Sequence, residues 1–185
     1  MEFHQAHSLF IERMTSRFKI ATSPNGLQQK YFLVLLLTFL AFVSAPAHAW
    51  TGQVVAVTDG DTLKVLQDGR EKKIRLYGVD TPEKKQAFGQ KAKDFTASLV
   101  AGKIVEVEPV DQDRYGRTVG LVTVVGRSLN KELVKNGFAW VYRQYCRRGE
   151  CSAWLAEESQ ARAARIGLWA DPEPMPPWEW RKATK

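Results

Sequence analysis

The sequence from residue 50 onward predicts an α+β fold in which β-strands predominate. Its first half alternates short β-branched, apolar runs with Gly- and Asp-containing turns, and its second half places apolar residues at helical spacing. Five short strands with about three helices inserted among and after them are typical of a closed, five-stranded barrel of the OB type. We therefore expect one mainly β domain over residues 50–170, a length that suits a single core.

Five segments have the composition of strands: residues 53–58, 62–66, 71–77, 103–110 and 118–125. An Asp-Gly-Asp turn separates the first two strands, and the hairpin signal Gln-Asp-Gly-Arg at 67–70 precedes the third. The last two strands are joined by the loop 113–117.

Three segments have the spacing of helices: residues 88–100, 128–136 and 152–166. In the first, Ala92, Phe95 and Leu99 fall on one side, and Gly102 follows its end. Ser128 is a candidate N-cap for the second helix. The chain is therefore strand-rich first and helical later.

Residues 1–49 have the features of a secretory signal peptide. Residues 31–43 form an uncharged apolar run that is short for a transmembrane helix, basic residues precede it, and small residues stand at Ala47 and Ala49. We expect cleavage before Trp50, with Met14 as an alternative start of translation. An uncleaved anchor is the alternative. Cleavage predicts an exported protein, periplasmic or extracellular, with no stable membrane association.

The charge and the histidine content restrict the chemistry. The chain has a formal net charge of +7, and residues 50–185 keep an excess of basic residues, which is compatible with a polyanionic partner. All three histidines precede Trp50, so histidine-based metal sites and Ser-His catalysis are excluded after that residue. Acid–base catalysis would then depend on carboxylates.

Only residues 171–185 differ in composition from the rest of the domain; they form a Pro- and Trp-rich C-terminal tail.

Three short motifs combine hard oxygen donors, two arginines and a spare carboxylate. They are Asp-Gly-Asp-Thr at 59–62, Ile-Arg-Leu-Tyr-Gly-Val-Asp-Thr-Pro-Glu at 74–83, and Asp-Arg-Tyr-Gly-Arg at 113–117. Such groups are needed to hydrolyse a phosphodiester with a divalent cation. In order and spacing the motifs resemble the staphylococcal (micrococcal) nuclease family, also called thermonuclease, over about residues 50–169.

The resemblance implies a function as well as a fold. The family has the OB-type barrel and contains Ca²⁺-dependent nucleases that cleave DNA and RNA with little sequence preference. In their reaction water attacks phosphorus, the 5′ oxygen leaves, and the products carry 3′-phosphates. We therefore expect nucleic acid as the substrate and Ca²⁺ as the cofactor, and we expect a monomer.

The resemblance also implies the metal ligands. Asp61 and Asp80 correspond to the aspartates that bind Ca²⁺, and the backbone carbonyl of Thr81 corresponds to a third ligand. Carboxylate and carbonyl oxygens are the ligands that Ca²⁺ prefers. Asp59 would then be a nearby charge. Either motif alone would equally be a tight turn or a strand exit, because short motifs often match by chance.

Three side chains are expected to carry the reaction itself. Glu83 corresponds to the family's general base, and a carboxylate beside a cation can accept a proton from water. Arg75 and Arg117 correspond to its two catalytic arginines, whose guanidinium forks fit phosphate oxygens and keep their charge. For a lone glutamate or arginine, a solvated surface position would be the default interpretation.

The resemblance places substrate contacts on tyrosines. Tyr115 is expected to stack on a base or touch a phosphate. A second substrate-contacting tyrosine should follow Gly137, where Tyr142 and Tyr145 are both candidates and buried packing is an equal alternative for each.

The two cysteines, Cys146 and Cys151, are five positions apart. In an exported chain they predict a local disulfide, since a zinc site would need two more ligands. Glu158, which the family also carries, is expected to be a structural ion-pair partner.

A non-catalytic OB-type module that binds nucleic acid or protein is the alternative function. Degeneration should remove the catalytic groups first. All five of these groups remain, which favours the enzyme; they are Asp61, Arg75, Asp80, Glu83 and Arg117.

Overall fold

The computed structural model describes residues 48–184, which belong to one compact unit, Pro46–Lys185. Apart from its last two positions, the signal peptide predicted at residues 1–49 lies outside the described residues. None of the helices within residues 48–184 combines the length and the apolar character that crossing a membrane requires. The fold described below is therefore that of the segment expected to remain after cleavage.

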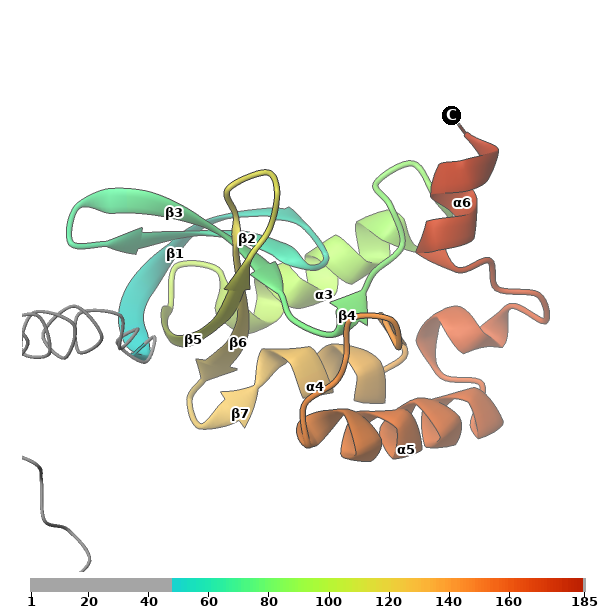
Figure 1. Ribbon diagram of the computed structural model, residues 1–185. Coiled ribbons are helices and arrows are strands. Elements are labelled where there is room, and N and C mark those ends of the chain that lie inside the picture. The colour runs from blue at the N-terminus through green and yellow to red at the C-terminus, as the bar shows by residue number, and fades with distance from the viewer. Residues whose placement is uncertain (1–47, 185) are drawn as a thin grey trace, which may run out of the picture. The chain divides into compact units, whose positions relative to one another are not determined.

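Five strands form a closed barrel (Figure 1), as predicted. In spatial order β3, β2, β1, β5 and β6 pair antiparallel, and β3 also pairs parallel with β6, which closes the sheet. Their bounds are β1 Trp50–Asp59, β2 Thr62–Gln67, β3 Arg70–Leu76, β5 Ile104–Gln112 and β6 Thr118–Val124. The closing pair sets Arg75 beside Val119, which brings the start of β6 next to β3.

Three two-residue strands supplement the barrel. β7 (Arg127–Ser128) extends the sheet beyond β6. β4 (Val79–Asp80) pairs antiparallel with β8 (Trp140–Val141), so Asp80 stands opposite Trp140. Two residues are too few to show a period of two, so no pattern in the sequence predicts these pairings. The β4–β8 pair matters here because it fixes the backbone at Asp80.

The three predicted helices are present, with ends that differ from the predicted ones by no more than three residues. They are α3 (Gly89–Val100), α4 (Leu129–Lys135) and α5 (Glu150–Ala163). The hydroxyl of Ser128 accepts a hydrogen bond from Lys131 N at 3.3 Å, which confirms the predicted N-cap. Two further elements follow: the 3₁₀-helix η1 (Gly167–Ala170) and α6 (Pro177–Ala183), a helix within the C-terminal tail.

The main core fills the barrel and continues beneath the helices. Alternate residues of the strands point inward, as period-two pairing requires; Leu63, Ile74 and Val107 are fully buried. A second, smaller cluster joins Trp140, Ala161, Leu168 and Trp169, and Trp178 packs against it. This second cluster attaches the C-terminal segment to the side of the barrel that carries β4 (Figure 1).

Candidate active site

Asp61 and Asp80 come from different elements and are both almost completely buried, with 5% and 1% of their surface exposed. Asp61 lies in the turn between β1 and β2, where its carbonyl accepts a hydrogen bond from Leu76 N at 2.8 Å. Asp80 ends β4. The barrel and the β4–β8 pair therefore hold two carboxylates in positions that are shielded from solvent.

Thr81 connects the two aspartate segments. Its backbone N–H and its hydroxyl both donate to Asp61 Oδ2 at 2.9 Å, and the hydroxyl of Thr62 donates to Asp61 Oδ1 at 3.1 Å. A Cβ at position 60 would lie 2.7 Å from Thr81 Oγ1, so glycine is required for this close approach. The Asp-Gly-Asp turn is thus packed closely against Thr81, the first residue of the loop that follows β4.

Arg75 bridges the two aspartates. Its Nη1 lies 2.8 Å from Asp61 Oδ2, and its Nη2 lies 2.8 Å from Asp80 Oδ1. The side chain is 15% exposed and projects from β3, where Arg75 pairs with Thr62 of β2. Because one guanidinium reaches both carboxylates, they are close enough to share a single cationic group.

Burial and mutual repulsion govern the carboxylates beside Arg75. Burial alone would raise the pKa of Asp61, but the charge of Arg75 and hydrogen bonds from Asp59 and Thr81 outweigh it, so this pKa is lowered. Burial, followed by the negative charge of Asp61, raises the pKa of Asp59 to about 7. Asp61 therefore favours its ionised form, whereas ionisation of the neighbouring Asp59 is opposed by burial and by the charge of Asp61. The two carboxyl groups together carry more negative charge than their surroundings balance.

Burial also raises the pKa of Asp80, with a further contribution from the charge of Asp61. Hydrogen bonding from Arg181 and the charge of Arg75 oppose this rise without cancelling it. Asp80 thus depends on its cationic partners to remain ionised.

The oxygen donors here fit a hard divalent cation. Within residues 48–184 no three or more His, Cys, Asp or Glu side chains are grouped to hold a metal. The set expected from sequence has two carboxylates and one carbonyl, from Asp61, Asp80 and Thr81. Two buried carboxylates that already converge on one cationic group, with only oxygen donors, suit Ca²⁺ rather than zinc.

Glu83 lies in the loop after β4, and the start of α3 packs against its backbone. Its N–H donates to Gln86 Oε1 at 3.0 Å, and its carbonyl accepts from Gln86 N at 2.8 Å. A Cβ at position 89 would lie 1.9 Å from the Glu83 carbonyl oxygen, so only glycine fits there. The backbone of Glu83 is therefore fixed, while its carboxylate is 37% exposed and accessible to solvent.

Arg181 of α6 is a site residue that sequence reasoning missed. Its guanidinium contacts Asp80 Oδ2 at 2.8 Å and Glu83 Oε1 at 2.6 Å. Partial burial would lower the pKa of Arg181, but hydrogen bonds to the two carboxylates raise it overall. The only signal in the sequence is the unusual Pro- and Trp-rich composition around it, which identifies no contact.

Arg117 is not part of this ion-pair cluster. Its Nε lies 2.7 Å from Asp113 Oδ2, and Asp113 Oδ1 accepts hydrogen bonds from Tyr115 N and Arg117 N, each at 2.9 Å. Burial would raise the pKa of Asp113, but these hydrogen bonds and the charge of Arg117 outweigh it and lower this pKa. Thr118, the next residue, pairs with Ile74, so the loop lies at the strand that carries Arg75.

The predicted tyrosine contacts occupy two different environments. Tyr115 is 70% exposed, and the guanidinium of Arg117 lies 5.7 Å from its ring centroid. Tyr142 stacks on Trp178 of α6, with ring centroids 5.3 Å apart and an interplanar angle of 6°, and Tyr145 meets it edge-on. Tyr115 is thus open to a ligand, whereas one face of Tyr142 is covered by the tail.

Cys146 and Cys151 form a disulfide with a Cα–Cα distance of 5.7 Å, between β8 and α5. The hydroxyl of Tyr77 accepts hydrogen bonds from Arg147 N and Arg148 N inside the closed loop. Glu158 accepts hydrogen bonds from the Arg162 side chain and from Val141 N. These contacts stabilise the segment that joins β8 to α5 and do not involve the carboxylates of Asp61 and Asp80.

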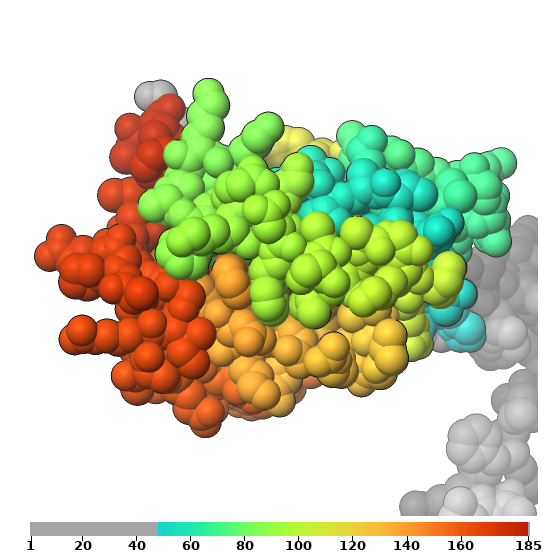
Figure 2. Space-filling model, turned by 180° about the vertical axis from the view of Figure 1, so that it is seen from behind, coloured from blue at the N-terminus to red at the C-terminus, as the bar shows by residue number. Residues whose placement is uncertain are grey.

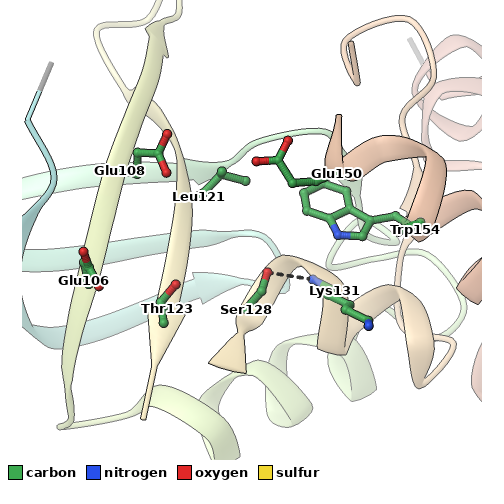
Figure 3. Close-up of a pocket in the computed structure, with 9 residues that line it drawn as sticks. Glu106, Glu108, Leu121, Thr123, Ser128, Lys131, Glu150 and Trp154 are labelled. Atoms are coloured by element: carbon green, nitrogen blue, oxygen red, sulfur yellow. Dashed lines mark hydrogen bonds between the residues drawn. The ribbon is translucent and has the colours of Figure 1, made fainter. Parts of the chain in front are cut away.

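Two surface grooves are present that do not include the aspartates. One, of about 410 Å³, lies between β5, β6 and α5, where Figure 3 shows Glu106, Glu108 and Glu150 around it. The other, of about 450 Å³, is bordered by Tyr142, Trp178 and Lys182. Neither includes Asp61, Asp80, Glu83 or Arg75, so the chemistry of the side chains, and not the depth of a cavity, identifies the site.

Comparison with known proteins gives one consistent family. Residues 73–171 match the family model described as "Staphylococcal nuclease homologue". The protein named "Micrococcal nuclease" from Shigella flexneri is 39% identical over 153 residues, which cover 77% of this chain and 87% of its own length. An "Uncharacterized endonuclease" from Haemophilus influenzae is 41% identical, covering 82% and 84%, and "Protein ParB" from Escherichia coli is 38% identical, covering 84% and 94%.

Proposed function

Because the chain belongs to the staphylococcal nuclease family, we propose that it is an exported, Ca²⁺-dependent nuclease that hydrolyses DNA and RNA with little sequence preference. The relatives named nuclease and endonuclease support a nuclease, and support cleavage within a strand. The observation that carries the proposal is the convergence of buried Asp61 and Asp80 on one cationic group, with Glu83 three residues after Asp80.

In this proposal Asp61, Asp80 and the carbonyl of Thr81 hold the cation. A bound divalent cation supplies Lewis-acid stabilisation of charge on a phosphoryl oxygen. The hydrogen bonds from Thr81 and Thr62 fix the orientation of the Asp61 carboxylate, so its ligand geometry is set before any ion arrives.

Glu83 acts as the general base. Its exposed carboxylate accepts a proton from the attacking water while the water oxygen forms a bond to phosphorus. The bond from phosphorus to the 5′ oxygen breaks, and that oxygen takes up a proton from solvent. The products are a 3′-phosphate and a free 5′-hydroxyl. The hydrogen bonds between the Glu83 backbone and Gln86 support this role because they hold the loop that carries the base.

The two arginines stabilise the transition state. A pentacoordinate phosphorus carries more negative charge on its oxygens than the substrate does, so fixed guanidinium groups favour it. The Nη groups of Arg117 have no ion-pair partner among the described residues and can turn to phosphate, and Tyr115 beside it offers a face for a base.

Location and assembly follow from the same proposal. The uncharged apolar run at 31–43 and the small residues at Ala47 and Ala49 support export with cleavage before Trp50. The Cys146–Cys151 disulfide suits an oxidising compartment. We propose that the enzyme acts as a monomer and that it does not remain attached to a membrane.

The test compares Asp80→Asn with Asp68→Asn, a control at an exposed turn between β2 and β3. Wild type and Asp68→Asn should nick plasmid DNA and degrade RNA in Ca²⁺, and Asp80→Asn should lose about 10²-fold or more in rate. Circular dichroism checks that each variant is folded. Normal cleavage by Asp80→Asn would reject the site, and binding of nucleic acid by wild type without any cleavage would indicate a non-catalytic module.

A further inference from the structure

The C-terminal helix α6 brings a guanidinium into contact with two site carboxylates that lie about 100 residues earlier in the chain. Arg181 Nη2 donates to Asp80 Oδ2 at 2.8 Å, and Nη1 donates to Asp80 Oδ1 at 3.3 Å and to Glu83 Oε1 at 2.6 Å. Figures 1 and 2 both show the red C-terminal segment bordering the green segment that follows β4. Arg181 therefore joins a proposed cation ligand to the proposed base.

Aromatic packing holds α6 in place. Trp178 stacks on Tyr142 and meets Trp140 edge-on at 6.5 Å between ring centroids. Trp178 and Arg181 are three residues apart and so lie on the same side of the helix. Pro177, at the first helical turn, is buried. The ring contacts of Trp178 thus direct the Arg181 side chain toward Asp80.

A second connection ties the tail to the Glu83 loop. Gln86 Nε2 donates to the Met175 carbonyl at 2.6 Å, while Gln86 Oε1 accepts from Glu83 N at 3.0 Å. Gln86 is 7% exposed, so this bridge is shielded from water. The tail therefore contacts both the backbone and the carboxylate side of the loop that carries Glu83.

We propose that Arg181 is a positioning residue of the nuclease site that lowers its affinity for divalent cations by competing for Asp80. Asp80 Oδ1 accepts hydrogen bonds from Arg75 and Arg181. Among the described residues, Arg181 is the only hydrogen-bond donor to Asp80 Oδ2. A cation that binds through Oδ2 must displace this charge-assisted hydrogen bond, and the cost is subtracted from its binding free energy.

The inference rests on the proposed function, because it takes Asp61 and Asp80 as the cation ligands. Its effect is specific to Asp80: Arg181 has no ion pair with Asp61 within residues 48–184. The contact with Glu83 adds a second anchor, so Arg181 remains beside the site when Asp80 is taken. A residue with a merely structural role would, on removal, loosen Asp80 and weaken cation binding.

Calorimetric titration of Ca²⁺ into the protein without nucleic acid tests the inference. Arg181→Gln should bind Ca²⁺ about three- to tenfold more tightly than wild type, since a partly exposed charged hydrogen bond is lost. Arg181→Lys keeps the charge but not the fork and should show a smaller gain. Lys182→Gln removes the same charge from an exposed neighbour that has no ion pair within residues 48–184, and it should change affinity less than about twofold.

Each outcome decides between the proposals. Equal or weaker Ca²⁺ binding by Arg181→Gln, with normal binding by wild type, would overturn the role of Arg181 and leave the proposed function intact. No Ca²⁺ binding by any variant would reject the cation site and the inference together. Should Arg181→Gln fail to fold, Arg181→Lys decides: affinity equal to or below that of wild type would overturn the inference.

Discussion

The two arginines expected to act together are held in opposite ways. Arg75 is locked between two buried aspartates that arrive from the β1–β2 turn and from β4, so its position depends on the whole barrel. Arg117 is held by Asp113 within its own five-residue loop. The difference predicts two roles: Arg75 neutralises buried negative charge in the folded protein. In the proposed mechanism Arg117 contacts phosphate and contributes little to stability.

This contrast predicts the largest effect for Arg75. In Arg75→Gln, Asp61 loses its only ion pair among the described residues, and breaking a buried pair costs about 3 kcal/mol of unfolding free energy. Turnover should also fall by about 10²-fold or more. Urea unfolding and single-turnover cleavage measure the two losses. Unchanged stability would mean that Arg75 does not neutralise the aspartates.

Glu83 should affect the chemical step and not the affinity for nucleic acid. Glu83→Gln keeps the volume and removes the base, so turnover should fall by about 10²-fold, while nucleic-acid affinity stays equal or becomes slightly tighter because a negative charge is lost. A binding titration beside single-turnover cleavage at one salt concentration separates the two. Glu179→Gln, at an exposed position of α6, is the matched control. Normal cleavage by the Glu83 variant would show that Glu83 is a loop carboxylate and not the general base.

Arg117 provides the other half of the contrast. Arg117→Gln should lower turnover by about 10²-fold, as loss of a preorganised charge does, yet change the unfolding free energy by less than about 1 kcal/mol, because its ion pair is partly exposed. The control is Arg127→Gln at an exposed position of β7, which should alter neither quantity appreciably. If Arg117→Gln were as destabilising as Arg75→Gln, the two arginines would not differ in the way proposed here.

A smaller effect is expected at Asp113, which orients Arg117 through two backbone N–H groups and Nε. Asp113→Asn keeps an acceptor but loses the ion pair, so turnover should fall by about tenfold with little change in stability. The loss should be much smaller in an Arg117→Gln background, since both substitutions act through one side chain. A full tenfold loss in that background would assign Asp113 a separate role.

Sequence patterns predicted the barrel because its strands are long enough to show a period of two. The predicted strands fall within one to three residues of β1, β2, β3, β5 and β6, and the three main helices were placed by their apolar spacing and by the Ser128 cap. The pairing of β4 with β8 was not predictable, because two-residue strands carry no period. It is nevertheless this pairing that fixes the backbone at Asp80.

The site could be predicted only where its residues belong to one of the motifs that resemble the nuclease family. The Asp61, Thr81 and Arg75 contacts join positions that the nuclease resemblance already grouped. The contact of Arg181 with Asp80 spans about 100 residues and depends on Trp178 packing against Tyr142, neither of which a local pattern records. The prolines that precede α6 indicated a tail, since they favour extended backbone and turns.

The most direct test of the Asp61–Asp80 site is metal dependence of cleavage. Purified residues 50–185 should lose all nuclease activity in excess chelator and recover it when Ca²⁺ is returned. Mg²⁺ demands tighter octahedral geometry, so it should not restore comparable turnover. Full cleavage of DNA in excess chelator would contradict a cation-dependent site at Asp61 and Asp80.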